Sequence, residues 1–143
     1  MALYLITSLK CTVQGIDLDA GRIHRANKKF KQKSHRGFAV CSILKAEDMR
    51  RKFFEKSFDT VIITHALHHL SNVRKALTQA KGVLTRAGKI IIVEYAASFG
   101  ETVDDCPRFS IHKIKTLIKM AGFQKVKPIN LLPGLLVIIG YKN

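Results

Sequence analysis

Residues 57–70 have the sequence SFDTVIITHALHHL. Within them Phe58–Thr64 is short and rich in β-branched residues, which predicts a strand that is apolar on both faces at its centre. Ser71 is expected to cap a helix, and Gly88 ends the connection to a second strand at residues 89–94. The helix between them is predicted from apolar residues at spacings of four, three and four: Val73, Leu77, Ala80 and Leu84. Strand, helix and strand in this order predict parallel pairing, because parallel strands need a long crossover.

The same alternation precedes this segment. Asp19 is expected to cap a helix that runs to about Gln32, with Ile23, Ala26 and Phe30 on its inner face. The other elements predicted here are an apolar helix at 2–10, strands at 12–16 and 38–43, and a short polar helix at about 48–54.

A different pattern closes the chain. Ser110 is expected to cap a helix that ends at Gly122. Two strands, 124–128 and 135–141, are then separated by a short Pro-Gly loop, which predicts an antiparallel hairpin at a sheet edge. The whole pattern predicts a Rossmann-like α/β fold: a mostly parallel sheet with helices on both faces and a C-terminal hairpin.

Length and composition set the class of protein. A chain of 143 residues with 47% hydrophobic residues predicts one folded domain, 1–143, and excludes wholesale disorder. The longest apolar run, Ile90–Val93, is far too short to cross a membrane, and no secretory signal is visible. Cys11, Cys41 and Cys106 are too scattered for a disulfide framework or a metal motif. We therefore expect a cytoplasmic protein with no metal and no membrane contact.

Charge is the unusual feature of the composition. The chain carries 25 Lys and Arg against 10 Asp and Glu, a formal net charge of +15. Arg22–Arg36 contains seven of these basic residues and no acid. Such a run is either a solvated helix face or a phosphate-binding patch for RNA. Phe30 and Phe38 are expected to be buried, which argues against base stacking, so we expect any RNA binding to be weak and salt-dependent.

Four segments together resemble one enzyme family. They are VQGIDLD at 13–19, SFDTVIITHALHHL at 57–70, LTRAGKIIIVEY at 84–95 and AGFQKVKPINLLPGLLVIIGYK at 121–142. In order and spacing they resemble class I S-adenosylmethionine-dependent methyltransferases, in particular the small-molecule group of quinone biosynthesis. The resemblance spans most of the chain from Val13 onward. It implies S-adenosylmethionine as cofactor and a small-molecule methyl acceptor.

The family begins with a strand and a glycine-rich turn that approaches the methionine end of the cofactor. The first residues here, MALYLITSL, resemble the helix that follows this turn, and the turn itself is not found among the 143 residues. We therefore expect weak or no cofactor binding by this chain, and two strand edges without a middle strand. Such edges are expected to close together or to pair with another copy in a homodimer, unless the chain is incomplete, that is, truncated at its N-terminus relative to the family. The alternative function is a non-catalytic binding or assembly module, with RNA contact through the basic run.

The resemblance also implies cofactor-binding residues. Asp17 ends a strand and is placed to accept from the ribose hydroxyls, unless it only caps the next helix, and Leu18 would pack beside the adenine. After the next strand, Ala46 fits the backbone donor to the adenine ring. Lys45 occupies the usual place of an acid, so the acceptor role passes to Glu47 or Asp48, or Asp48 only caps the short helix.

Thr64 and His65 lie at the end of the strand predicted at 58–64, where the family places the sulfonium and the mouth of the substrate pocket. His68 and His69 are candidates for a catalytic base, or one of them is a packed residue at the entry to the helix. A metal site is not expected there, because adjacent histidines point in different directions and no third ligand is near. Glu94 and Tyr95 either face the substrate pocket or simply end their strand.

Overall fold

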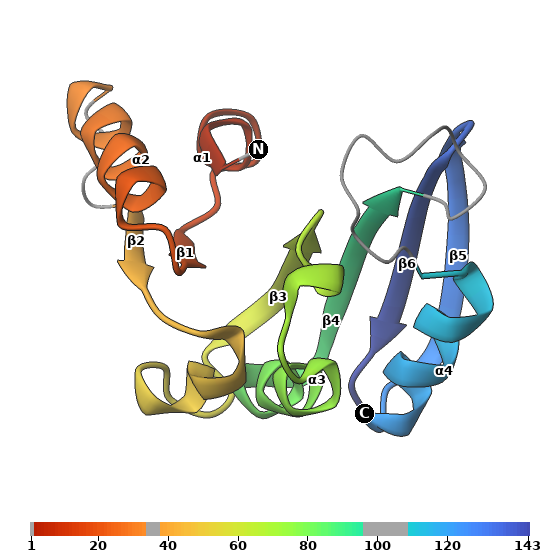
Figure 1. The fold of residues 1–143 in the computed structure, drawn as a ribbon. Coiled ribbons are helices and arrows are strands. Elements are labelled where there is room, and N and C mark those ends of the chain that lie inside the picture. The colour runs from red at the N-terminus through yellow and green to blue at the C-terminus, as the bar shows by residue number, and fades with distance from the viewer. Residues whose placement is uncertain (1, 34–37, 96–108) are drawn as a thin grey trace. The chain divides into compact units, whose positions relative to one another are not determined.

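The computed structural model describes residues 2–33, 38–95 and 109–143. These residues form two compact units, Met1–Ala46 and Glu47–Asn143 (Figure 1). Each unit has its own sheet, and each is described by itself below.

The first unit alternates helix and strand. Its elements are α1 (Ala2–Leu9), β1 (Val13–Asp17), α2 (Ala20–Gln32) and β2 (Ala39–Ile43). The two strands pair in parallel, from Val13 opposite Ala39 to Asp17 opposite Ile43. Ile6 of α1 and Phe30 of α2 pack in one core cluster with Ala39, so both helices cover the same face of this sheet.

Polar and small residues fix the pairing of these strands. The side-chain amide of Asn27 donates to the Cys41 carbonyl at 2.9 Å, and its oxygen accepts from the Cys41 N–H at 2.8 Å. Gly15 lies opposite Cys41, where an added Cβ would approach the Cys41 sulfur to 2.5 Å. The glycine therefore leaves room for the thiol.

The second unit contains a four-stranded sheet in the order β3-β4-β6-β5. β3 and β4 are parallel, whereas β4–β6 and β5–β6 are antiparallel. Its elements are η1 (Ala46–Arg51), β3 (Phe58–Thr64), η2 (Leu67–His69), α3 (Val73–Val83), β4 (Leu84–Tyr95), α4 (Ile111–Met120), β5 (Gln124–Leu132) and β6 (Leu135–Tyr141).

A close approach between α4 and the sheet organises the second core. Ile90, Ile114, Ile118 and Ile138 are completely buried. A Cβ added at Gly140 would lie 2.7 Å from the Ile118 side chain, so only glycine lets α4 pack this near to β6.

The predicted class is confirmed: the fold is α/β with parallel strands, flanking helices and a C-terminal hairpin. The strands form two sheets rather than one. Among the described residues, β1 pairs only with β2 and β3 pairs only with β4, so each has an open edge. The sequence predicted β3 to be apolar on both faces at its centre, and of its residues Ile63 is the one that is buried.

Several boundaries differ from the prediction, among them the short polar helix, which is η1 at Ala46–Arg51 instead of about 48–54. Three differences change a cap or a strand pairing. Asn72, not Ser71, caps α3: its side chain accepts from the Lys75 N–H at 2.9 Å. β4 begins at Leu84, directly after α3, because Leu84 already pairs with Phe58. β5 continues four residues beyond Pro128 along its partner β6.

Two predictions about exposure and membranes can be compared with the structure. Phe30 is buried, but Phe38 is 54% exposed, so the expectation that both rings are buried was wrong for Phe38. Phe38 immediately precedes β2 and lies outside its pairing with β1, which begins at Ala39. No helix in the described ranges is long and apolar enough to cross a membrane.

Candidate functional site

Asp17 ends β1 with a half-exposed carboxylate. One oxygen, Oδ1, accepts from the Asp19 N–H at 3.0 Å, and Oδ2 lies 3.7 Å from Arg22 Nη1. Asp19 is the residue that caps α2, because its side chain accepts from the Arg22 N–H at 2.9 Å. This hydrogen bond holds the pKa of Asp19 below its usual value. Asp17 is therefore not needed as the cap. Among the described residues, its Oδ2 has a contact with the Arg22 guanidinium at 3.7 Å and accepts no hydrogen bond from a backbone N–H.

The neighbouring candidates in this unit lie at the same end of the sheet. The Leu44 N–H donates to the Asp17 carbonyl at 3.1 Å, which joins the chain leaving β2 to the end of β1. Ala46, the predicted backbone donor, follows two residues later and is half-buried. Leu18 is 61% exposed, so its side chain is available to cover an apolar ring.

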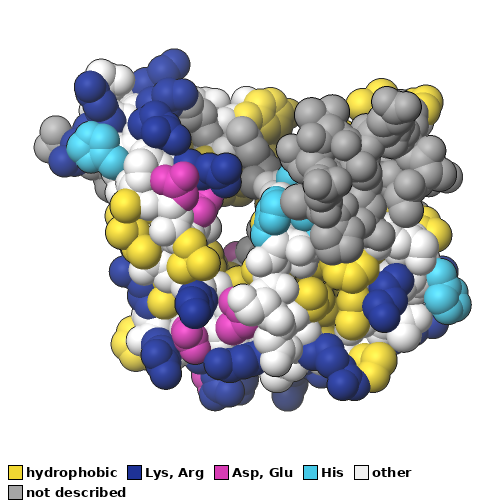
Figure 2. All heavy atoms as spheres, in the orientation of Figure 1, with side chains coloured by type: hydrophobic (Ala, Val, Ile, Leu, Met, Phe, Trp, Pro, Cys, Tyr) yellow, Lys and Arg dark blue, Asp and Glu magenta, His cyan; other side chains and the backbone are white. Residues whose placement is uncertain are grey.

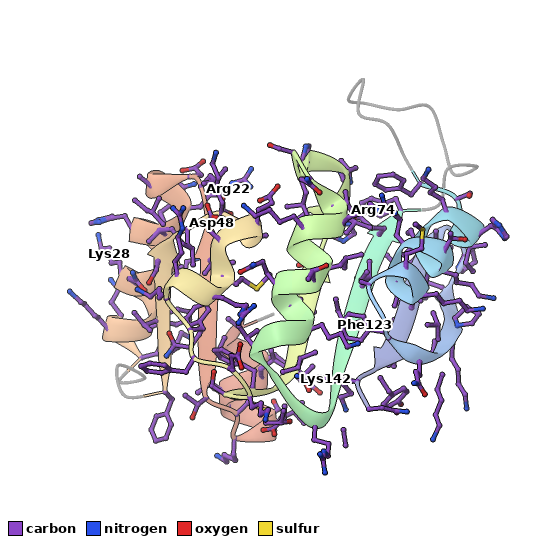
Figure 3. The ribbon with its side chains drawn as sticks, turned by 90° about the horizontal axis from the view of Figure 1, so that it is seen from below. Arg22, Lys28, Asp48, Arg74, Phe123 and Lys142 are labelled. Carbon is purple, nitrogen blue, oxygen red and sulfur yellow. The ribbon has the colours of Figure 1, made fainter. Side chains whose placement is uncertain are left out.

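Glu47 and Asp48, the two acids predicted to replace Lys45, have partners in the second unit. Glu47 is buried, and its Oε1 accepts from the Asn72 N–H at 2.9 Å, which anchors the start of α3. Asp48 pairs with Lys75 at 3.3 Å and with Arg51 at 3.7 Å. Asp48 lies within η1 at a kink, where its own φ of −126° and ψ of 18° are not helical; Figure 3 labels it. Of the two, Asp48 has the more accessible carboxylate.

A buried carboxylate holds the loop after β3. Glu94, near the end of β4, is 3% exposed. Its Oε1 accepts from the Leu67 N–H at 2.7 Å, and its Oε2 lies 3.0 Å from His68 Nδ1. Glu94 is thus neither a simple strand end nor an open pocket residue. The sequence did not reveal this pairing, because Glu94 and His68 are 26 residues apart and only the adjacency of β3 and β4 brings them together.

The remaining candidates surround this pair. His65 has a positive φ of 47° and stacks on Tyr95, with ring centroids 4.4 Å apart. The rings of His68 and His69 lie 4.1 Å apart, so the expectation that they point in different directions was wrong: the tight η2 turn brings them into contact. Thr64 ends β3 directly before His65 and is half-buried. No group of three metal-ligating side chains occurs among the residues that the structure describes.

The cysteines supply no reactive group that the structure identifies. Burial raises the pKa of the Cys41 thiol, which disfavours the thiolate form. Cys11 is a free thiol, and Cys106 lies outside the described residues.

Comparison with known proteins identifies the family. A family model described as a methyltransferase domain matches residues 1–92. The chain therefore belongs to the methyltransferase-domain family, as the four sequence segments indicated.

Individual relatives are consistent with this assignment. An uncharacterized methyltransferase of Mycobacterium tuberculosis is 30% identical over 83 residues, which are 58% of this chain and 39% of that protein. The ubiquinone/menaquinone biosynthesis C-methyltransferase of a Geobacter species is 24% identical over 151 residues, covering 96% of this chain and 63% of that enzyme. The chain thus spans less than two thirds of either relative.

A solved structure supports the fold. The structure of PigF with SAH superposes with a TM-score of 0.76 at 12% identity, covering 99% of this chain and 46% of PigF. At this identity the likeness establishes the methyltransferase-like fold alone.

Proposed function

We propose that the chain is an S-adenosylmethionine-dependent methyltransferase that transfers a methyl group to a small-molecule acceptor. The observation that carries this proposal is Asp17: a carboxylate at the carboxyl end of a parallel strand, held by the Asp19 N–H and free of the capping role. In open α/β sheets ligands bind at this end of the strands, and a carboxylate there accepts from the ribose hydroxyls.

The other cofactor contacts in the proposal are those that the family resemblance implies. Leu18 would cover one face of the adenine, and the Ala46 N–H would donate to the ring. Asp48 is the better acceptor for the adenine amino group, since one oxygen of Glu47 already binds the Asn72 N–H. Thr64 and His65 would lie beneath the sulfonium.

The acceptor would bind near the end of β4. When bound, S-adenosylmethionine would supply the methyl group to the acceptor nucleophile with cleavage of its carbon–sulfur bond and release of S-adenosylhomocysteine, so the protein would need mainly to hold and align the two molecules. The acceptor's proton needs a base. His68 would fill this role through Nε2, and its contact with Glu94 through Nδ1 supports the proposal. His69, exposed beside it, is the second candidate.

A methyl-transfer assay tests the proposal. The chain is incubated with S-adenosylmethionine carrying a ¹³C-methyl group and a panel of small phenols, hydroxy acids and quinols. Labelled product and S-adenosylhomocysteine are then measured by mass spectrometry. The proposal predicts labelled product with at least one acceptor, and its loss in the Asp17→Ala variant. Turnover unaffected by Asp17→Ala would contradict the assigned cofactor contact.

The open edges of β1 and β3 favour a second candidate, a non-catalytic binding or assembly module. Unpaired strand edges are templates for pairing with another chain. This alternative predicts a stable homodimer with no labelled product in the assay above. Light scattering after size-exclusion chromatography distinguishes the two, because a monomer that turns over substrate excludes the assembly module.

A further inference from the structure

The exposed side of α2 carries a dense positive charge. Six basic side chains of α2 and its C-cap are exposed. We call them together the α2 basic surface: Arg22, Arg25, Lys28, Lys29, Lys31 and Lys33. Figure 2 shows dark-blue side chains gathered over α2, and in Figure 3 the labelled Lys28 projects away from the ribbon. Within residues 1–46 there are nine Lys and Arg against two acids, so the acids of this segment balance only a small part of the charge.

The arrangement of these residues follows from the helical repeat. At 100° per residue, Arg22, Arg25, Lys29 and Lys33 form one stripe about 17 Å long. Lys28 and Lys31 extend the charge around the side opposite the core. Figure 3 shows Arg22 near one end of this helix.

Internal ion pairs leave most of this charge unneutralised. Arg22 contacts Asp17 at 3.7 Å and Asp19 at 3.6 Å. Among the described residues, no carboxylate forms an ion pair with the other five members of the surface. Keeping five unpaired cations on one short helix costs repulsion that a polyanion would relieve.

We infer that the α2 basic surface binds the phosphate backbone of single-stranded RNA without regard to sequence. Regularly spaced lysines and arginines on a rigid helix neutralise successive phosphates and release their counterions. Phe38, exposed in the same unit, offers a ring for base stacking.

An anionic membrane is a poorer partner for this surface. Membrane-surface helices insert an apolar face between the headgroups. The apolar face of α2 is occupied instead, because Phe30 is 4% exposed and Ala26 packs against the same core. The α2 basic surface can therefore contact a partner through charge alone, and the phosphate backbone of a dissolved RNA needs no apolar insertion.

Salt dependence gives the expected size of the effect. About four of the six side chains can contact one RNA strand at a time. This predicts a slope of about −2.8 in log K against log salt for single-stranded nucleic acid. Affinity should then fall about 20-fold between 50 and 150 mM salt.

The test is fluorescence anisotropy of a labelled 20-nucleotide uridine oligomer, measured with the whole chain over a series of salt concentrations. Substituting Lys28, Lys29, Lys31 and Lys33 by Gln should abolish binding at the lower salt concentration. A matched control neutralises four basic residues of the second unit, Arg74, Lys113, Lys115 and Lys119, and should retain binding within about twofold. Circular dichroism of both variants checks that the fold is kept, because none of these eight side chains is buried.

A variant with two substitutions tests the inference even if the variant with four substitutions unfolds α2. Substituting only Lys29 and Lys33 by Gln should reduce the salt slope by about 1.4, one increment per lost phosphate contact. An unchanged slope would overturn the inference, as would equal loss in the control. Binding of phosphatidylserine vesicles with no RNA binding would also overturn it and favour a membrane surface.

Discussion

Replacing Asp17 by alanine should weaken the binding of adenosine-type ligands by more free energy than it removes from the stability of the fold. The substitution removes an acceptor for two ribose hydroxyls, a loss of about 2–4 kcal/mol if both bonds form. That is about a 30- to 900-fold rise in Kd. Within the protein, Asp17→Ala loses one hydrogen bond, from the Asp19 N–H at 3.0 Å, and a long contact to Arg22. The expected cost in unfolding free energy is only about 1 kcal/mol.

Asp19→Ala is the matched control, two residues away on the same turn. It removes the N-cap of α2, which should lower the midpoint of urea unfolding, and it leaves the Asp17 carboxylate in place. Both variants are measured by calorimetric titration with S-adenosylhomocysteine and by urea unfolding. Adenosine and 2′,3′-dideoxyadenosine are then compared, because the dideoxy ligand has no hydroxyls to lose. The ribose contact would be refuted if Asp17→Ala weakened the binding of both nucleosides equally, or if Asp17→Ala and Asp19→Ala weakened binding to the same extent.

Three further predictions concern packing, the buried carboxylate and cofactor affinity. Gly140→Ala should destabilise the chain by about 1–3 kcal/mol in urea unfolding, because the new Cβ meets Ile118 at 2.7 Å; an unchanged midpoint would contradict this packing. Glu94→Ala should cost about 2–5 kcal/mol, since it leaves the Leu67 N–H and His68 Nδ1 without their acceptor, whereas Glu94→Gln should keep most of the stability; equal losses would argue against these bonds. The 143-residue chain should bind S-adenosylmethionine more weakly than micromolar, because its sequence contains no glycine-rich turn, and a micromolar or tighter Kd by calorimetry would contradict this expectation.

Local signals in the sequence were sufficient for most of the fold. The Asp19 cap of α2 and the hairpin of β5 and β6 depend on residues close together in the chain, and both are confirmed. Ser71 and Asn72 are equally suited to cap a helix from sequence alone. Glu47, far away in sequence, binds the Asn72 N–H, and this contact accompanies the cap at Asn72.

The candidate site was less predictable for the same reason. Asp17 could be singled out because it ends a strand, and the structure adds that Asp19 takes the capping role. The bond between Glu94 and His68 depends on the pairing of β3 with β4, which no local pattern encodes. The division into two sheets likewise depends on which strands find partners, a property of the whole chain.

The central claim is that this methyltransferase-family chain binds the adenosyl group of its cofactor through Asp17 and the adjoining strand ends. The most direct measurement is a nuclear magnetic resonance titration of the ¹⁵N-labelled chain with S-adenosylhomocysteine. The account predicts saturable shifts of the amides at 17–19 and 45–48, absent in the Asp17→Ala variant. Saturable shifts confined to other parts of the chain, or no saturable shift at all, would contradict it.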